Sequence, residues 1–373
     1  MGKSVLITGC SESTIGNALA LEFAKRGWIV YATARNTAKM ANLEGNSNVK
    51  LLALDITDAK DVFAAREQIS VEQGGKLDCL YHNAGVRSMS MAIDYDADEK
   101  QVMTAGEEQP YIRSDDVRMF EGNVIAVMAL TRAFSKLLIA AKGTIAITGS
   151  GASRVQVPTE ATYNATKAAV EMYAKTLRLE LQPFGCHVVY VMTGAVATPM
   201  YFQRMTFSDD SPYKPIADRI AAGWEQGPRY VPQRTEEYAR YVVERVTRMS
   251  PPKKVWCGTG IAALCWVEKF GLTWLLDGLI VFLWLKYGQP WPFSKAIKTD
   301  ACKSSLQFKR SLEKKTMVPQ MRVLQNGLGE PFLKQTSSIP VRFKLALAVR
   351  YMTTHMPTLK DLLWVLLTEK LIF

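Results

Sequence analysis

Short apolar runs alternate with amphipathic stretches through residues 1–200. The apolar runs predict buried β-strands, and the longer stretches between them predict helices. The predicted strands are Ser4–Thr8, Trp28–Ala32, Leu51–Leu54, Leu77–His82, Thr144–Thr148 and His187–Met192. The predicted helices are Ile15–Lys25, Asp58–Gln73, Val117–Ala140 and one that carries Tyr163. The alternation is typical of an α/β fold in which a doubly wound parallel sheet of the Rossmann type has helices on both faces.

Tyr163 and Lys167 stand four residues apart in a stretch rich in alanine, with no Gly or Pro before Pro183. On a helix the two side chains project from the same face. A phenol ionises near pH ~10 in water, and a nearby ammonium group favours the phenolate. The pair can therefore exchange a proton with a substrate oxygen. The same spacing also arises by chance, as an exposed Tyr beside a solvated Lys.

The loop Gly9–Thr14 joins the first predicted strand to the first predicted helix. Free amides and the positive dipole end of that helix suit a pyrophosphate, although an ordinary strand-to-helix turn reads the same way. The second strand is followed by Arg35, where an acidic residue would hold a ribose 2′-hydroxyl. An Arg suits a 2′-phosphate, which favours NADP(H); an exposed structural Arg is the alternative.

Composition places the chain among globular proteins, with 48% hydrophobic and 22% charged residues. No secretory leader is expected, because a strand-like run begins at Ser4. The six Cys include no CxxC pair and no grouping with the three His, so reduced thiols and no metal site are expected. Residues 286–373 carry 15 Lys/Arg and 5 Asp/Glu, so most of the net charge of +11 belongs to this tail.

These features resemble the short-chain dehydrogenase/reductase family over roughly residues 3–200. The resemblance rests on five motifs in the right order: Thr8-Gly9 with Ile15-Gly16, Asn83-Ala84-Gly85, Asn123, Ser150 and Tyr163/Lys167. In that family a Ser lies thirteen residues before the Tyr, as Ser150 does here. A narrower resemblance is to the fungal NADPH-dependent 1-acyldihydroxyacetone-phosphate reductases. It is carried by Tyr31–Arg35, Thr193–Val196 and Val255–Gly258, features shared with fungal reductases of specialised metabolism.

The resemblance implies a role for each matched residue. Tyr163 would protonate a carbonyl oxygen, Lys167 would lower the pKa of the phenol and hold the nicotinamide ribose, and Ser150 would hydrogen-bond the same oxygen. Asn123 would anchor a water in a proton relay. Cofactor contacts are expected from Gly9, Ser11, Ile15, Gly16, Arg35, Asp55, Asn83, Tyr163, Lys167, Val196 and Thr198. Two alternatives stay open, because Asp55 also suits an Asx turn and the neighbouring Ser153 suits a helix or turn cap.

The chain departs from the family pattern in three places. The glycine loop is one residue longer, with Ser13 or Thr14 where a second Gly is expected, so a side chain is predicted to crowd the phosphate site. About sixteen additional residues lie within 94–116, as a surface loop or as a disturbance of the helix with Asn123. The third departure is the chain beyond about residue 287. The predicted organisation is an NADP(H)-binding catalytic domain over 1–258, a membrane-associating segment over 259–287 and a basic extension over 288–373.

Residues 198–232 are predicted to form the substrate loop. Its apolar positions, Met200, Tyr201, Phe202 and Met205, suit a lid over an acyl chain or packing onto the core. Arg204 and Lys214 are candidates for binding an anionic head group, with plain surface charge as the alternative.

Phe270–Leu285 is apolar except for Asp277. As a helix it would span about 24 Å, short of the ~30 Å hydrocarbon core, and Asp277 would add roughly 3 kcal/mol to full insertion. An interfacial or hairpin-like anchor is therefore favoured over a single span, with packing against the core or a partner as the alternative. The expected location is the cytosolic face of the endoplasmic reticulum or a lipid droplet, or else the cytoplasm. Lys309-Arg310 and Lys314-Lys315 lack an aromatic platform, so no nucleic acid is expected.

Three functions compete. The first is an NADPH-dependent reductase of a lipid-like ketone, with 1-acyldihydroxyacetone phosphate leading. The second is a ketoreductase that tailors a polyketide or terpenoid. The third is a non-catalytic NADP(H)-binding protein at a membrane surface. Pairing into a homo-oligomer through Val117–Ala140 and Tyr163–Leu181 is expected from the family resemblance.

Overall fold

In the computed structural model of the chain, the described residues are 2–93, 114–203 and 231–269, with single positions between 204 and 230. They belong to the first of two units into which the chain divides, Met1–Val281. Most of the predicted insertion within 94–116, the candidate Arg204, the apolar segment Phe270–Leu285 and the basic extension 288–373 lie outside the described residues.

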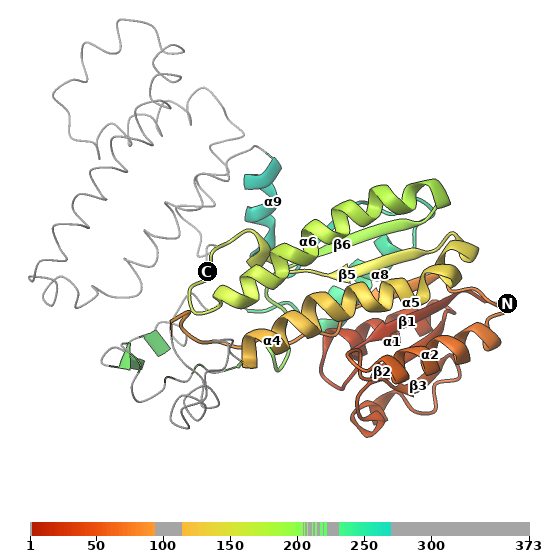
Figure 1. Ribbon diagram of the computed structural model, residues 1–373, viewed down its shortest axis with the longest axis horizontal. Helices are drawn as coiled ribbons and strands as arrows, with labels where there is room; N and C mark the ends of the chain where they lie inside the picture. Colours follow the sequence, from red (N-terminus) through yellow and green to blue (C-terminus); the bar gives the residue numbers. More distant parts are fainter. Residues whose placement is uncertain are drawn as a thin grey trace, which may run out of the picture. The chain divides into compact units, whose positions relative to one another are not determined.

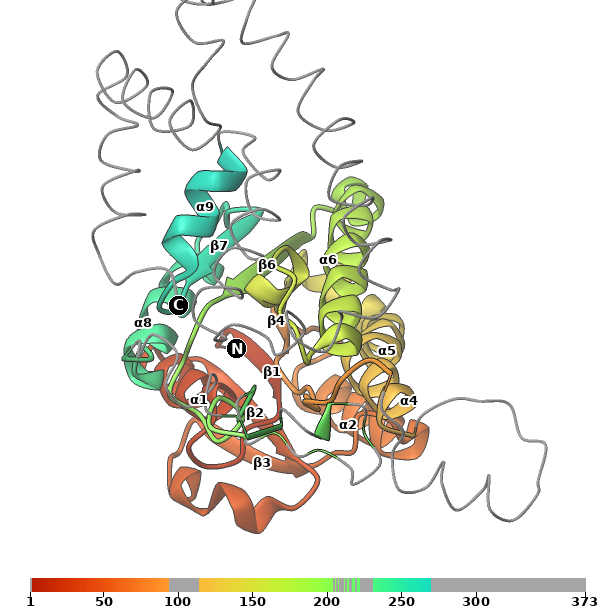
Figure 2. The same ribbon diagram turned by 90° about the vertical axis from the view of Figure 1, so that its left-hand side faces the viewer.

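Seven strands form one parallel sheet in the order β3-β2-β1-β4-β5-β6-β7 (Figure 1 and Figure 2). The strands are β1 (Ser4–Thr8), β2 (Ile29–Ala34), β3 (Val49–Ala53), β4 (Cys79–His82), β5 (Thr144–Thr148), β6 (His187–Thr193) and β7 (Lys254–Cys257). The first six match the predicted strands to within a few residues, β7 adds a seventh at the edge, and the predicted α/β fold of the Rossmann type is confirmed. The central strands are buried along their whole length, which is why they read as continuous apolar runs.

Helices cover both faces of the sheet, as Figure 2 shows. On one face α1 (Ile15–Lys25) packs against α8 (Thr235–Val246). The other face is covered by α2 (Ala59–Glu72), α5 (Ala126–Ala141) and α6 (Ala161–Leu181). Between α1 and the sheet, the buried Phe23 ring meets Tyr81 edge to face at 6.4 Å between centroids. This close packing on both faces holds the strand ends in fixed positions.

The helix after β4 changes its winding where Asn123 lies. α4 (Ser114–Phe120) passes into a single π-turn, η2 (Glu121–Ile125), and then into α5. Such turns add one residue to a helix and are frequent at functional sites. The described residues contain one helical stretch long and apolar enough to span a membrane, Asp115–Ala141. It contains this whole π-turn, packs against α6 and β4 and serves as a core helix.

Helix α9 (Ile261–Lys269) occupies the start of the segment predicted to associate with a membrane. Its residues Ile261, Leu264 and Val267 are buried, and the helix packs against β7. These residues therefore extend the catalytic unit beyond position 258, while the remainder of the predicted segment, from 270, lies outside the described residues.

The sheet places the chemistry at the carboxyl ends of its strands. β1 lies between β2 and β4, so the chain continues to one side through β2 and β3 and then returns to the other side at β4. Open α/β sheets bind ligands in the crevice outside such a switch point. The loops that begin at Gly9 and Asn83 meet there, because a Cβ on Gly9 would lie 2.9 Å from the Cα of Ala84.

Candidate active site

The loop after β1 folds around two glycines. Gly9 has a positive φ of 75°, and a Cβ on Gly16 would lie 2.3 Å from the carbonyl oxygen of Gly9. Ser13, one of the two residues that stand where a second glycine is expected, has a φ of 65° and so adopts the left-handed conformation that favours glycine. The Thr14 hydroxyl is directed inward, since it donates to the Ser11 carbonyl at 2.6 Å and accepts from the Asn17 amide at 3.3 Å as the cap of α1. The Thr14 side chain therefore does not crowd the mouth of the loop.

The first turn of α1 offers free donors. Among the described residues, the amides of Ile15 and Gly16 donate to no protein acceptor. Helix N-termini with free amides bind phosphate groups. This arrangement fits the pyrophosphate of a dinucleotide, and the predicted cofactor contacts of Gly9, Ser11 and these two residues remain a prediction.

Asn83 joins three strands. Its side-chain amide donates to the carbonyls of Thr8 at 3.0 Å and Gly9 at 3.2 Å, and its Oδ1 accepts from Thr148 at 3.2 Å. The Thr8 hydroxyl also accepts from the amides of Asn83 and Ala84. Asn83 therefore fixes the ends of β1, β4 and β5 relative to one another, and its contact with the cofactor stays a prediction.

Arg35 is exposed at the end of β2 and forms no ion pair within the described part of the chain. Asp55 lies near this guanidinium. Hydrogen bonding from Thr57 lowers the pKa of the Asp55 carboxyl, and the positive charge of Arg35 lowers it further. Thr57 donates to Asp55 Oδ1 through its amide at 2.9 Å and its hydroxyl at 2.7 Å. Asp55 thus forms the Asx turn considered from the sequence, and its contact with adenine stays a prediction.

Asn123 is buried in the π-turn η2 and links three segments. Its side-chain amide donates to the Val86 carbonyl at 2.8 Å and to the Thr166 hydroxyl at 3.1 Å, and its Oδ1 accepts from the Val86 amide at 2.8 Å. Asn123 therefore holds the loop after β4 against α6, beside the site. The predicted role in anchoring a water is a further step that these contacts do not include.

Tyr163 and Lys167 share one face of α6, as the spacing predicts. Lys167 Nζ lies 5.5 Å from the centroid of the Tyr163 ring and donates to the Thr148 carbonyl at 3.3 Å. Both residues are buried, with 9% and 7% of their surface exposed. The ammonium group therefore sits at the carboxyl end of β5, next to the phenol and away from bulk water.

Burial determines the acidity of both groups. Burial and the negative charge of Glu160 raise the pKa of Tyr163 to about 12, against the lowering effects of Arg87 and of a hydrogen bond with Ser150. Burial lowers the pKa of Lys167 to about 8. The pKa of Tyr163 is therefore shifted opposite to the predicted direction, because desolvation of the phenolate outweighs the nearby positive charges. Tyr163 is a proton donor at neutral pH.

Ser150 and Ser153 have different partners. Ser150 caps the short helix η3 (Gly151–Ser153), since its Oγ accepts from the Ala152 amide at 3.1 Å, and it also reaches Tyr163. Ser153 donates its hydroxyl toward Glu171 at 2.7 Å, on the far side of the turn. Of the two serines, Ser150 is the one beside the phenol.

Two more predicted cofactor contacts lie after β6. Val196 is buried and bridges to Gln233, while the Thr198 carbonyl accepts from the Tyr201 amide at 2.9 Å. Val196 and Thr198 stand beyond the carboxyl end of β6, on the same edge of the sheet as Ser150. Their contacts with nicotinamide stay a prediction.

A buried ion pair near the phenol was not predicted from the sequence. Arg87 Nη2 meets Glu160 Oε1, and Arg87 Nη1 donates to the Met200 carbonyl at 2.9 Å. Their side chains are 12% and 5% exposed, and Arg87 Nε has no hydrogen-bond partner among the residues that the structure describes. Glu160 stands three residues before Tyr163, but 73 residues separate it from Arg87, so only the fold reveals the pair. It connects the loop after β4, the start of α6 and the beginning of the substrate loop.

Comparison with known proteins gives consistent matches. The family model "short chain dehydrogenase" matches residues 3–207. Short-chain dehydrogenase PC-15 of Penicillium crustosum is 38% identical over 241 residues, which cover 65% of this chain and 83% of that protein. The NADPH-dependent 1-acyldihydroxyacetone phosphate reductase of Schizosaccharomyces pombe is 40% identical over 196 residues, 52% of this chain and 60% of that protein.

A solved structure has the same fold. A short chain dehydrogenase from Burkholderia cenocepacia in complex with NADP superposes with a TM-score of 0.53 at 20% identity. The match covers 74% of this chain and 97% of that structure.

Proposed function

The chain belongs to the short-chain dehydrogenase family of oxidoreductases, and we propose that it is an NADPH-dependent reductase of a lipid-like ketone, with 1-acyldihydroxyacetone phosphate as the leading substrate. One observation carries the proposal. The phenol of Tyr163, the hydroxyl of Ser150 and the ammonium group of Lys167 come together at the carboxyl edge of the sheet, beside its switch point.

The residues of the site fit NADP(H). The amides of Ile15 and Gly16, which donate to no acceptor in the described part of the chain, suit the pyrophosphate, and the exposed guanidinium of Arg35 suits a ribose 2′-phosphate. Lys167 would donate to the nicotinamide ribose. When bound, NADPH supplies a hydride to the carbonyl carbon.

The chain's own groups handle the oxygen and the proton. Tyr163 is protonated at neutral pH, so it can donate its proton to the carbonyl oxygen as negative charge develops there. Ser150 donates a second hydrogen bond to the same oxygen, which stabilises the transition state more than the ketone. The nearby ammonium group of Lys167 favours the phenolate that remains.

Two observations support a lipid-like substrate. Curated relatives include the reductase of 1-acyldihydroxyacetone phosphate in fission yeast. In addition, Phe202 is 65% exposed and stacks edge to face on Tyr201 at 5.2 Å, at the start of the predicted substrate loop. The exposed Phe202 ring, beside the half-buried Tyr201, suits contact with an acyl chain.

The experiment is a measurement of NADPH oxidation by the full-length protein with palmitoyl-dihydroxyacetone phosphate. We expect Tyr163→Phe to abolish turnover, and Tyr241→Phe, 39% exposed on α8, to leave it unchanged. Turnover of uncharged ketones alone would refute the lipid phosphate. Full activity of Tyr163→Phe would refute the assigned proton donor.

A second candidate, a tailoring ketoreductase for a polyketide or terpenoid, is favoured by one observation. The guanidinium of Arg87, beside Tyr163, is already neutralised by Glu160. A net-neutral pair beside the phenol suits an uncharged ketone better than a phosphate. Comparing kcat/KM for a long-chain methyl ketone and for the acyl phosphate ketone decides between the two candidates. The non-catalytic alternative is set aside, because the residues that catalysis needs lie together.

We also propose binding to a membrane surface and pairing of two copies. The apolar segment and basic tail of the sequence support attachment to the cytosolic face of the endoplasmic reticulum or to lipid droplets, with a cytoplasmic protein as the alternative. A cleft of about 340 Å³ between α5 and α6, lined by Met128, Tyr173 and Leu177 among others, supports pairing through these helices. Flotation with anionic liposomes tests the first proposal, and light scattering tests the second.

A further inference from the structure

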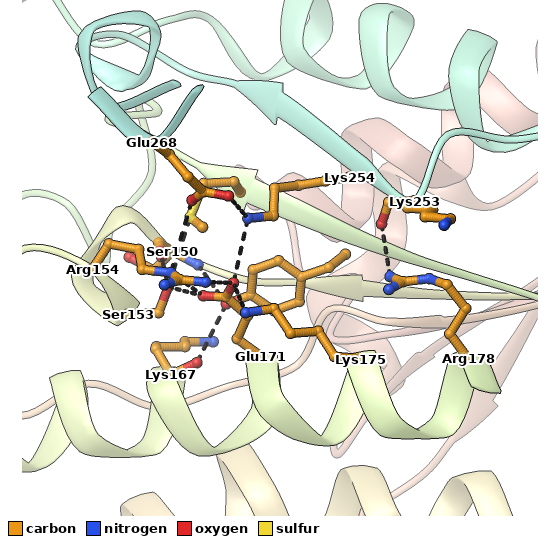
Figure 3. Close-up of polar contacts among 12 residues, drawn as sticks. Ser150, Ser153, Arg154, Lys167, Glu171, Lys175, Arg178, Lys253, Lys254 and Glu268 are labelled. Atoms are coloured by element: carbon orange, nitrogen blue, oxygen red, sulfur yellow. Dashed lines mark hydrogen bonds and ion pairs between the residues drawn. The ribbon is translucent and has the colours of Figure 1, made fainter. Parts of the chain in front are cut away.

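A buried carboxylate lies behind the site, on the same helix as the phenol. Glu171 follows Tyr163 and Lys167 at steps of four residues, so the three side chains share one face of α6. Glu171 is 3% exposed and, as Figure 3 shows, it is surrounded by polar side chains from several elements. No step of the proposed reaction uses it.

Glu171 is held from three sides. Arg154 donates to both of its oxygens, through Nε at 3.0 Å and Nη2 at 2.5 Å. Lys175 lies at 3.1 Å and Lys254 at 3.4 Å from Oε1. Burial raises the pKa of the carboxyl, but hydrogen bonds from Arg154, Ser153 and Lys175 outweigh burial and bring the pKa of Glu171 to about 2. Glu171 is therefore ionised throughout the physiological range.

This carboxylate reaches the catalytic serine through one residue. Ser153 Oγ lies 2.7 Å from Glu171 Oε2 and 2.9 Å from the Ser150 carbonyl oxygen, and its single proton can serve one of them at a time. The Ser153 amide also donates to the Ser150 carbonyl at 3.1 Å. A charged acceptor makes the stronger hydrogen bond, so Glu171 fixes the rotamer of Ser153 and with it the turn that Ser150 caps.

The other side of Ser150 is fixed by Tyr190. The Tyr190 hydroxyl accepts from the Ser150 amide at 3.4 Å and donates to the Lys167 carbonyl at 3.3 Å. Gly149 permits this contact, because a Cβ there would lie 2.0 Å from the Tyr190 ring. The backbone of Ser150 is thus held between Tyr190 and the Glu171 network, and both connect to α6.

The network also extends to helix α9. Lys254 Nζ, which contacts Glu171, lies 2.6 Å from Glu268 Oε1, and Arg154 Nε lies 3.9 Å from Glu268 Oε2. Glu268 belongs to α9, while Lys254 begins β7. The turn with Arg154, helix α6 and strand β7 therefore meet at Glu171, and α9 is joined to them through the contacts of Glu268 with Lys254 and Arg154 (Figure 3).

We propose that Glu171 is a positioning residue for the reduction: with Arg154 it sets the hydroxyl of Ser150 relative to Tyr163 and makes that setting depend on the docking of α9. The inference rests on the proposed function. Misplacement of a catalytic group by about 1 Å can cost ~100-fold in rate. Loss of the carboxylate leaves Arg154 free to turn away from the Ser150 loop, which permits a displacement of this kind.

The test compares full-length variants with any ketone that the wild type reduces. We expect Glu171→Gln to lower kcat by about tenfold or more while the KM for NADPH changes less than about twofold, and Glu171→Asp to recover part of the rate. Glu268→Gln should lower kcat by about threefold, since it removes only the link to α9. Glu180→Gln is the matched control, because it is exposed on the same helix.

A double-mutant cycle separates positioning from plain stability. If Glu171 acts through Ser150, Glu171→Gln should lower kcat little further in a protein that already carries Ser150→Ala. Effects on kcat that multiply, or a lowered melting temperature with unchanged kcat, would overturn the inference. If Glu171→Gln does not fold, Glu268→Gln takes its place in the cycle with Ser150→Ala. A wild-type kcat in Glu268→Gln would overturn the proposed link to α9. If instead Tyr163→Phe stays active, the proposed function fails rather than this inference alone.

Discussion

Lys167→Met should make the protein more stable while it removes activity. At pH 7 the native protein buries a charged ammonium group whose pKa falls from 10.5 to about 8. A shift of this size corresponds to about 3 kcal/mol at ~1.4 kcal/mol per pH unit. Met removes that cost and also loses the hydrogen bond to the Thr148 carbonyl, which is worth ~1 kcal/mol. The expected gain in the free energy of unfolding is therefore about 2 kcal/mol at pH 7.

The difference in the free energy of unfolding between Lys167→Met and wild type depends on pH. Between pH 8 and pH 10.5 the unfolded chain binds the proton and native Lys167 does not, so wild-type stability rises with pH across this window. The advantage of the Met variant should then shrink to near zero by about pH 10. Other titrating groups are shared by both proteins, so the comparison cancels their contributions.

The assay is urea unfolding followed by circular dichroism at several pH values between 6 and 10, with wild type, Lys167→Met and Lys136→Met. Lys136 is exposed on α5, so its variant should show no gap that changes with pH. A Lys167→Met protein that is less stable than wild type at pH 7 would refute the reasoning. A stability gap that is independent of pH would refute it equally.

Arg35→Asp should raise the KM for NADPH by about tenfold and favour NADH, measured as the ratio of the two kcat/KM values; an unchanged ratio contradicts the assignment to the 2′-phosphate. Gly16→Ala places a Cβ 2.3 Å from the carbonyl oxygen of Gly9, so the free energy of unfolding, measured with urea, should fall by about 1–3 kcal/mol. With the pKa of Tyr163 raised to about 12, kcat/KM for alcohol oxidation should rise steadily with pH up to pH 10, and a plateau near pH 7 would contradict that pKa. Leu179, 70% exposed on α6, should be needed for pairing, so light scattering should find Leu179→Glu monomeric.

The fold was readable from the sequence because the signal is local. Fully buried parallel strands are short apolar runs, and β1, β4 and β5 stand within two residues of their predicted positions. The spacing of Tyr163 and Lys167 and the distance to Ser150 carried over directly, since one helix and one turn determine them. Asp55 also adopts the Asx turn that was weighed as an alternative, whereas the residue that caps η3 is Ser150 and not Ser153.

What escaped prediction depends on residues far apart in the chain. The acidity of Tyr163 follows from burial and from Glu160 and Arg87, and no periodicity reports the depth of a side chain. Glu171 reads as an ordinary helix residue until β7 and α9 bring Lys254 and Glu268 beside it. The π-turn at Asn123 has no sequence signature, because the flanking residues suit an α-helix equally well.

That π-turn has a consequence for the whole helix between Ser114 and Ala141. Each residue advances an α-helix by about 100°, so one additional residue rotates everything before it by that angle relative to everything after it. As a result, Met119 before the turn packs beside Tyr163, while Leu130 and Phe134 after it are buried in the core. Deleting a single residue from Glu121–Ile125 would leave an uninterrupted α-helix, yet it would rotate Met119 away from the phenol. A regular α-helix over this stretch could therefore not place Met119 beside Tyr163.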